Sequence, residues 1–323
     1  MVSGWAVTEA DLRARMSAAS VLETPANAIR ARLLASRPGR EVFVLEAGGG
    51  RVIAKCYPDR PRAQTGGERL ASFGGGHGPL VVPRCLKIDP ELRVVVMTVV
   101  PGIPLTAALD GPGAASAIAR VGRAVAALHA LPVTLPTALD RAEELDRASR
   151  APVARADRAQ VHAALDKAAT LLGAAPSMGL VPSHGDLGPA QILCADRVGI
   201  VDFDKAVMAE AALDLGTLLA QLARKRGATG RRLFDRFLDM YDVAARRARL
   251  AESAAAADRE LTQSVVRGYA LLVLVRKLAW LPSEDQQPVR AAIDSLVISP
   301  ADLPGRRFGV THPLQATPPR GAD

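Results

Sequence analysis

The stretch Val181–Asp204, with the sequence VPSHGDLGPAQILCADRVGIVDFD, decides how this chain is interpreted. It contains two short apolar runs, Ile192–Cys194 and Gly199–Val201, separated by polar residues typical of a tight turn. If the runs pair as a hairpin with a two-residue Asp-Arg turn, Gln191 and Asp202 lie side by side at its open end. Asp-Arg is not a favoured pair for such a turn, so a register one residue away stays open.

Oxygen-bearing side chains gather at this open end. Asp186 precedes the hairpin, and Asp204 falls on the same strand face as Asp202 if the strand continues. Carboxylate and amide oxygens are ligands that Mg²⁺ accepts, with phosphate and water completing its shell. The mouth of the hairpin, with Gln191 and Asp202, is therefore predicted to be a magnesium site.

The pattern H-G-D-x-x-x-x-Q followed by V-D-F-D resembles the aminoglycoside phosphotransferase and choline kinase-like superfamily, which is related to the protein kinases. The resemblance extends over roughly residues 25–290, and residues 184–214 are its specific part. It implies an α+β, two-lobed protein-kinase-like fold, with a small β-rich N-lobe and a larger, mainly helical C-lobe. Gln191 stands where most members have Asn. Sugar-kinase-like branches, including maltokinase-like enzymes, often carry Gln there, so the departure favours that branch.

The resemblance implies a role for each polar residue of the pattern. Asp186 would orient and deprotonate the hydroxyl of an acceptor. Gln191 and Asp202 would bind Mg²⁺, with Asp204 as a further ligand or a close neighbour. Two plainer interpretations stay open: Asp186 as an ordinary loop residue, and Asp204 as the ion-pair partner of Lys205 or of an arginine.

Two further residues are expected to support the loop. His184 is expected to pack and hydrogen-bond there rather than to titrate. Asp214 precedes an apolar helical stripe and could be the N-cap of that helix. The resemblance implies that Asp214 also holds the catalytic loop, and both roles can be true.

The run Arg51–Tyr57 (RVIAKCY) predicts a strand with Ile53, Lys55 and Tyr57 on one face. A lysine inside such a strand needs a partner for its charge. The resemblance implies that Lys55 is the third-strand lysine of kinases, which binds the α- and β-phosphates and pairs with a helix glutamate. Protection of an edge strand is the alternative.

Glu68, in the run TGGERLASF at residues 65–73, is the expected partner of Lys55. That run reads as a short helix. Thr65 and Glu68 also fit a capping box, in which the glutamate would instead accept from the Thr65 amide.

The resemblance further implies that the segment Met97–Val100, before Pro101-Gly102, is the hinge whose backbone recognises adenine. Within this segment, Met97 and Val99 are expected to make the contact. The loop at residues 36–40 is expected to cover the phosphates. The expected cofactors are ATP (or GTP) and Mg²⁺.

Lysine is rare in this chain, since only six of the 41 basic residues are lysine. A lysine in this chain is therefore more often than usual present for its chemical properties. The six are Lys55, Lys87, Lys167, Lys205, Lys225 and Lys277.

The predicted organisation follows the two lobes. Residues 1–99 form the nucleotide-binding lobe, residues 100–303 the catalytic and acceptor-binding lobe, and residues 304–323 a flexible tail. The segments 41–46, 51–57 and 92–100 read as strands, and helical periodicity begins near residue 114.

Composition excludes several other classes of protein. The 323 residues are 49% hydrophobic, which suits a large folded core, and the net charge of +8 lies mostly within residues 224–249. This local excess, without interleaved aromatics, argues against a nucleic-acid partner. No signal peptide or membrane-spanning run is evident, and three scattered cysteines suit a reducing compartment, so a cytoplasmic location is expected. Walker, HExxH and GxSxG motifs do not occur.

The sequence thus predicts an ATP- and Mg²⁺-dependent phosphotransferase that moves the γ-phosphate to a hydroxyl of a small molecule: a sugar, an antibiotic or another hydroxylated metabolite. The alternative is a pseudokinase-like, nucleotide-binding scaffold without turnover. The acceptor is expected between the hairpin loop and residues 235–285. Sugars are favoured over aminoglycosides because the chain is basic. The oligomeric state stays open.

Overall fold

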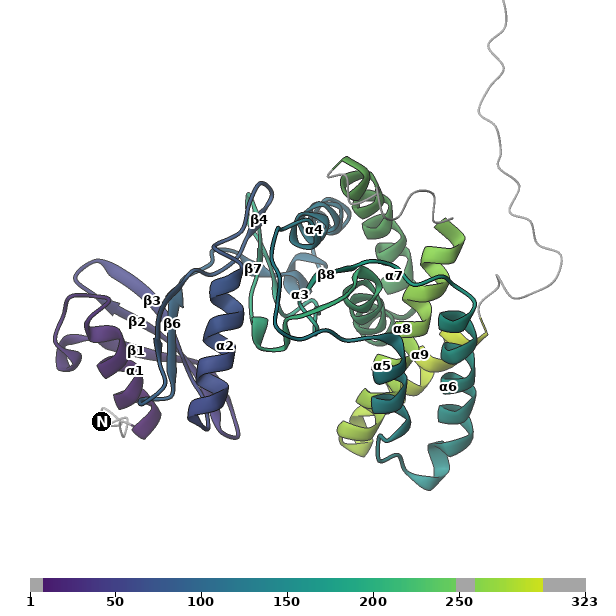
Figure 1. The fold of residues 1–323 in the computed structure, drawn as a ribbon, viewed down its shortest axis with the longest axis horizontal. Helices are drawn as coiled ribbons and strands as arrows, with labels where there is room; N and C mark the ends of the chain where they lie inside the picture. Colours follow the sequence, from purple (N-terminus) through teal and green to yellow (C-terminus); the bar gives the residue numbers. More distant parts are fainter. Residues whose placement is uncertain (1–7, 248–258, 299–323) are drawn as a thin grey trace, which may run out of the picture.

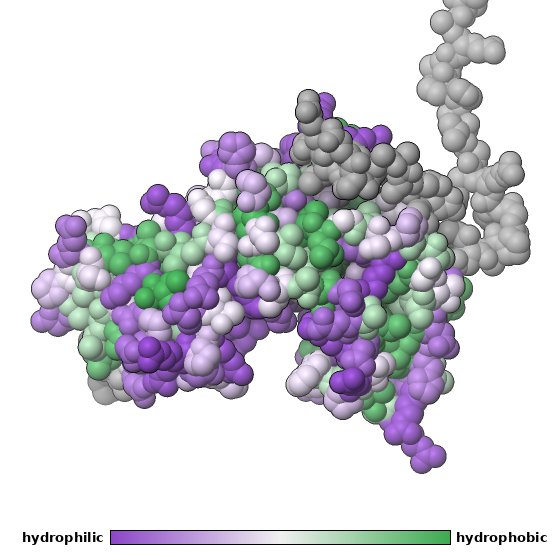
Figure 2. Space-filling model, viewed as in Figure 1, coloured by the Kyte–Doolittle hydropathy of each residue, from purple (hydrophilic) through white to green (hydrophobic). Residues whose placement is uncertain are grey.

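The computed structural model describes residues 8–247 and 259–298. Figure 1 shows a small lobe built around a sheet and a larger lobe built from helices, which confirms the predicted α+β two-lobed class. Strand β6 ends at Thr98, next to the predicted lobe boundary, and the predicted tail, residues 304–323, lies outside the described residues. Figure 2 shows the surface hollowed between the lobes.

A five-stranded antiparallel sheet forms the N-lobe, in the order β1-β2-β3-β6-β5. One face of the sheet, with Phe43, Leu45 and Val52, packs on Ala14 and Ala18 of helix α1. The opposite face carries Lys55 and faces the second lobe. The elements are α1 (Glu9–Ala19), β1 (Arg30–Arg37), β2 (Arg40–Ala47), β3 (Gly50–Cys56), α2 (Arg60–Ser72), β5 (Cys85–Asp89) and β6 (Val94–Thr98).

Helix α2 begins earlier than the sequence predicted. Its N-cap is Asp59, whose side chain accepts from the Arg62 amide, and a proline follows at the second helical position. Thr65 therefore lies inside the helix, and the capping-box interpretation of Thr65 and Glu68 is wrong.

Short strands join the two lobes (Figure 1). A four-stranded sheet has the order β4-β10-β9-β7, and β8 pairs antiparallel with β11. These strands carry the loop and the hairpin that the sequence pattern had marked. The strands are β4 (Leu80–Val81), β7 (Ile103–Pro104), β8 (Leu180–Ser183), β9 (Ile192–Cys194), β10 (Val198–Ile200) and β11 (Val207–Glu210).

The C-lobe is a helical bundle in which α4, α7 and α8 pack around one apolar core. Helix α7 is interrupted at Gly227, whose φ of 53° and ψ of −130° break the helical path. No described helix is long and apolar enough to cross a membrane. The helices are α3 (Leu105–Ala108), α4 (Ala114–His129), α5 (Arg141–Ser149), α6 (Arg158–Gly173), α7 (Ala211–Arg247), α8 (Arg259–Trp280) and α9 (Gln287–Val297), with 3₁₀ turns at Ala26–Ala28 (η1), Arg155–Asp157 (η2), Phe203–Lys205 (η3) and Ser283–Asp285 (η5).

Candidate functional site

The β9–β10 hairpin positions the predicted metal ligands, but in the alternative register. The Val201 amide donates to the carbonyl of Gln191 (2.9 Å), so Gln191 lies opposite Val201 rather than Asp202. The turn contains three residues, 195–197, where two were expected. None of the three adopts the positive φ that a two-residue hairpin turn requires, which explains the shift.

Asp202 ends the hairpin in an unusual backbone conformation. Its φ of 74° and ψ of 57° are left-handed, and a 3₁₀ turn, η3, follows at once. The expected continuation of the strand to Asp204 is therefore wrong. A left-handed aspartate costs about 1 kcal/mol or more, so the surrounding contacts must hold it there.

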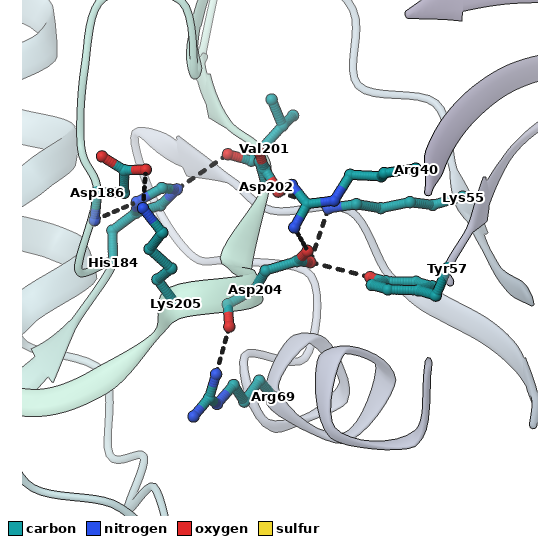
Figure 3. A network of polar contacts seen from close by, with 10 residues as sticks. All are labelled: Arg40, Lys55, Tyr57, Arg69, His184, Asp186, Val201, Asp202, Asp204 and Lys205. Carbon is teal, nitrogen blue, oxygen red and sulfur yellow. Dashed lines mark hydrogen bonds and ion pairs between the residues drawn. The ribbon is translucent and has the colours of Figure 1, made fainter. Parts of the chain in front are cut away.

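Both aspartates nevertheless converge on one cation from the other lobe (Figure 3). Lys55 Nζ lies 2.5 Å from Asp202 Oδ1 and 2.6 Å from Asp204 Oδ1. Lys55 is only 6% exposed, so its charge depends on these two carboxylates. The charge of Lys55 is thus partnered by the carboxylates of Asp202 and Asp204.

Glu68 is not that partner, and the expected ion pair is wrong for this structure. Glu68 is exposed on α2 and accepts from Gln64 Nε2. Its neighbour Arg69 faces the site instead and donates to the backbone carbonyl of Asp204. Successive side chains on an α-helix point about 100° apart. Because Arg69 faces the cleft, the preceding residue, Glu68, points away from it.

Asp204 is also held by two other N-lobe side chains. Arg40 Nη2 lies 2.5 Å from its Oδ2, and the Tyr57 hydroxyl donates to its Oδ1 (2.9 Å). Burial and the adjacent Asp204 carboxylate raise the pKa of Tyr57, so this hydroxyl remains a donor. Arg40, Lys55 and Tyr57 together tie the N-lobe to Asp204.

The charge state of Asp202 follows from the same neighbours. Burial alone would raise the pKa of this carboxyl. Lys55 and Arg40 outweigh that effect, so the pKa lies below its ordinary value and Asp202 is an anion.

Asp214 holds the loop at residues 184–186 from behind. This fully buried carboxylate accepts from the backbone amides of His184 (2.7 Å) and Gly185 (2.8 Å), and it contacts His129 Nε2 (3.1 Å). Helix α7 begins at Ala211, so Asp214 lies in its first turn and the N-cap interpretation is wrong. Its contacts with the loop are those that the sequence pattern implied.

His184 braces the loop from within. Its Nε2 lies 2.9 Å from the Val201 carbonyl, and its Nδ1 accepts from the Asp186 amide (3.2 Å). Because one ring nitrogen donates and the other accepts, the ring is the neutral tautomer. Gly185 between them has φ +77°, and a Cβ there would collide with the Lys205 carbonyl.

Asp186 meets Lys205 at the front of this loop. Lys205 Nζ lies 2.7 Å from Asp186 Oδ2 (Figure 3). Both side chains are exposed, so they are free to exchange this contact for one with a ligand.

Three adjoining cavities surround these residues. The sheet cavity (about 480 Å³) and the junction cavity (about 610 Å³) share Asp202 and Asp204. The junction cavity and the helix cavity (about 660 Å³) share Arg69, Asp186 and Lys205. Asp186 therefore stands at the boundary between a cavity with the predicted metal ligands and a cavity among the C-lobe helices.

Each cavity has its own lining. The sheet cavity is mainly apolar and includes Val42, Ile53, Met97, Val99, Leu193 and Val201; the junction cavity includes Arg37, Arg40, Tyr57 and Gln191; the helix cavity includes Glu143, Glu144, Arg147, Arg276, Lys277 and Trp280. Met97 and Val99 thus line the sheet cavity, and their contact with adenine stays a prediction.

A sequence profile of the phosphotransferase enzyme family matches residues 30–252, which is more than half of the chain. The chain belongs to this family. Membership confirms the predicted enzyme class, a phosphotransferase that acts on an alcohol group. No curated protein with a significantly similar sequence was found.

Solved structures share the fold of this phosphotransferase. A choline/ethanolamine kinase family protein from Mesorhizobium loti is 19% identical, with a TM-score of 0.61 over 91% of this chain and 96% of that one. Aminoglycoside phosphotransferase APH(4)-Ia is 14% identical, with a TM-score of 0.61 over 88% and 97%. A thermostable mutant of that enzyme, in a ternary complex with ADP and hygromycin B, has a TM-score of 0.60, 14% identity and the same coverage. These likenesses support the fold.

The side-chain oxygens at the junction cavity of this phosphotransferase are suitable ligands for Mg²⁺. Gln191, Asp202 and Asp204 line it with one amide and two carboxylates, and Asp204 Oδ2 accepts no well-directed hydrogen bond despite its ion pair with Arg40. Within the described ranges, no three His, Cys, Asp or Glu side chains form a metal cluster. Mg²⁺ ordinarily takes one or two carboxylates and completes its shell with phosphate and water.

The positions of three basic side chains at the site were not predicted from the sequence. Arg69 reaches the site from α2, Lys205 pairs with Asp186, and Lys277 lines the helix cavity from α8. The rarity of lysine in an arginine-rich chain was a signal for Lys205 and Lys277. No sequence signal distinguishes Arg69 from the other arginines.

Proposed function

We propose that this phosphotransferase moves the γ-phosphate of ATP to a hydroxyl of a small molecule, with Mg²⁺ and with Asp186 as the base. The observation that carries the proposal is the position of Asp186 between the junction and helix cavities. A phosphate held in the first cavity and a hydroxyl held in the second would meet at this carboxylate.

The sheet cavity is the proposed nucleotide site. Its apolar walls suit a purine, and the segment with Met97 and Val99 offers backbone groups beside it. Lys55 lines this cavity beside Asp202 and Asp204, where it would exchange its aspartate contacts for the α- and β-phosphates. The ternary complex of the related enzyme with ADP and hygromycin B supports the use of a nucleotide. GTP remains a second candidate.

Gln191, Asp202 and Asp204 are the proposed ligands of the metal. Bound Mg²⁺ would neutralise charge on the phosphates and orient them. Arg40 and Lys55 currently hold the two carboxylates, and they would move onto the phosphates when the site fills. Their presence keeps Asp202 ionised and holds both carboxylates at the cavity.

The proposed step is an in-line displacement. The acceptor oxygen forms a bond to the γ-phosphorus as the bond from that phosphorus to the bridging oxygen breaks, and ADP leaves. The hydroxyl proton passes to Asp186, whose place is set by the Asp214 contacts behind the loop. Lys205 counters the charge of Asp186 before the substrates bind.

One observation favours the alternative, a nucleotide-binding scaffold without turnover. The lysine–glutamate pair expected of an active kinase is replaced by contacts from Lys55 to Asp202 and Asp204. The two functions differ in one measurable respect, since only the enzyme transfers phosphate.

The test is Mg²⁺-dependent transfer from labelled ATP across a panel of hydroxylated compounds. We expect wild-type transfer and its loss in Asp202→Ala, because the variant lacks a metal ligand. Asp196→Ala is the matched control, since this carboxylate lies in the turn at the far end of the same hairpin. Nucleotide binding without transfer to any compound would favour the scaffold. Full activity in Asp202→Ala would contradict the proposed metal site.

A further inference from the structure

The helix cavity carries a charge pattern that bears on the acceptor. Three of its charged residues are acidic (Glu143, Glu144 and Asp186), and five are basic (Arg69, Arg147, Lys205, Arg276 and Lys277). The cavity is therefore basic. What matters for a ligand is which of these charges are already paired.

All three carboxylates have cationic partners. Glu144, only 1% exposed, lies 2.7 Å from an Arg276 guanidinium nitrogen and 3.2 Å from one of Arg147. Glu143 pairs with Arg147 at 2.5 Å. Asp186 pairs with Lys205 (2.7 Å). Each carboxylate of this wall is therefore already matched by a cation.

Two cations of the cavity lack an anionic partner. Lys277 is half-buried on α8, and its side-chain ammonium makes no hydrogen bond or ion pair with any residue that the structure describes. Arg69 donates to the Asp204 backbone carbonyl, and its buried Nε has no hydrogen-bond partner among the described residues. A carbonyl satisfies a donor but does not neutralise a charge.

The surroundings of Lys277 show that its charge is unsatisfied. Burial lowers the pKa of this ammonium group; the charge of Asp186 acts in the opposite direction, and Arg224, Lys205 and Arg276 lower it further. An anion bound beside Lys277 would stabilise the charged ammonium group and raise its pKa again. Lys277 and Asp186, the proposed base, line the same cavity.

An exposed aromatic ring lies on the same wall. Trp280, one turn after Lys277 on α8, is 79% exposed yet lines the helix cavity. Ligand pockets are commonly lined by aromatic side chains. Its flat face suits the apolar face of a ring such as a sugar.

We propose that the acceptor is a hydroxylated ring compound that carries an anionic group, a carboxylate or a phosphate, which Lys277 binds with support from Arg69. The ring lies against Trp280, and its hydroxyl reaches Asp186. This inference rests on the proposed phosphotransferase function and names the class of its substrate. A polycationic acceptor does not fit, because it would meet unpaired cations and only paired carboxylates.

The test compares acceptors that share one ring and differ in charge: glucose, glucuronate, glucose 6-phosphate and glucosamine, followed by a wider library sorted by charge. Transfer from labelled ATP and thermal stabilisation in the presence of ADP and Mg²⁺ are both measured. We expect anionic compounds to be the best acceptors and ligands. The two anions separate a carboxylate site from a phosphate site.

Variants of Lys277 connect the preference to this residue. Lys277→Met should raise the KM of anionic acceptors by about 10- to 100-fold, as expected for loss of one charged hydrogen bond. Lys277→Arg should recover most of the affinity. Arg150→Met is the control, since Arg150 is an exposed arginine at the C-cap of α5 and lies outside the cavity. The KM for ATP is the internal reference.

The inference is overturned if the best acceptor is neutral or cationic, if no anionic compound binds or reacts, or if Lys277→Met affects neutral and anionic acceptors equally. Failure of the proposed function looks different. The chain would then show no Mg²⁺-dependent transfer to any compound of any charge, and Asp202→Ala would match the wild type in nucleotide binding.

Discussion

Lys205 Nζ lies 2.7 Å from Asp186 Oδ2, and both residues line the junction cavity as well as the helix cavity. The pair therefore marks the place where the proposed nucleotide and acceptor sites meet. Asp186 is positioned by the backbone of its loop, whereas Lys205 is an exposed side chain at the end of η3. The backbone of the proposed base is thus fixed by its loop, whereas the counter-charge is carried by an exposed side chain.

Lys205→Met tests the role of that counter-charge. A cation at the meeting point of the two cavities should favour entry of the γ-phosphate, so we expect the KM for ATP to rise and transfer to fall by about 10-fold. Lys205→Arg should retain most of the activity because it keeps the charge. Steady-state kinetics with both variants measure this. Unchanged kinetics in Lys205→Met would show that the ion pair is incidental.

Lys55 and Glu68 should respond very differently to substitution. Lys55→Met removes the cation that joins the lobes at Asp202 and Asp204, and we expect transfer to fall by about 100-fold or more. Glu68→Gln should change transfer by less than about twofold, because the side chain is exposed and, among the described residues, hydrogen-bonds to Gln64 alone. If Glu68→Gln were as inactive as Lys55→Met, the active state would contain a Lys55–Glu68 pair that this structure lacks.

Gly185→Ala should displace the catalytic loop. The left-handed backbone and the adjacent Lys205 carbonyl leave no room for a Cβ, so we expect a loss of about 1–3 kcal/mol in unfolding free energy. Transfer should fall more than nucleotide affinity does, since Asp186 follows directly. Denaturant unfolding and nucleotide titration measure the two effects. Gly49→Ala is a control for positive φ, because its added Cβ meets no atom.

Asp214→Asn should change how stability depends on pH. Burial would raise the pKa of Asp214, but the contact with the His129 ring and the hydrogen bond from the His184 backbone amide outweigh it, and the pKa is depressed. A depressed pKa adds stability that is fully present above the unfolded value of about 3.9 and is lost as pH falls through the folded pKa. Asn cannot reproduce both acceptor oxygens, so we expect a loss of about 2–4 kcal/mol at neutral pH.

Urea unfolding of wild type and Asp214→Asn across acidic pH measures this. The difference in unfolding free energy between the two should shrink as pH falls below about 4. A difference that stays constant with pH would contradict the assigned ionisation of Asp214.

The loop and hairpin were predictable because their residues act locally. The order His184, Asp186, Gln191 and Asp202 along a short stretch leaves few ways to arrange the chain, and the two-lobed fold followed from the family pattern. The register was harder, since it depends on whether the turn tolerates positive φ. Asp-Arg does not favour it, and the hairpin formed the longer turn.

Which residue of α2 faces the cleft could not be predicted from the sequence. Glu68 and Arg69 are adjacent, and which one faces the cleft depends on where Asp59 caps the helix. The Asp59 signal is present in the sequence, but the competing Thr65–Glu68 pattern obscured it. Lys277 was beyond local reasoning as well, because α8 reaches Asp186 only through the packing of the C-lobe.

The most direct test of the account is single-turnover transfer from labelled ATP in wild type and in Asp186→Asn, with the best acceptor of the panel. We expect Asp186→Asn to bind nucleotide and Mg²⁺ as tightly as the wild type and to transfer phosphate about 10²- to 10⁴-fold more slowly. Equal transfer rates in the two proteins would contradict the central claim that Asp186, at the boundary of the two cavities, is the base of a phosphotransferase.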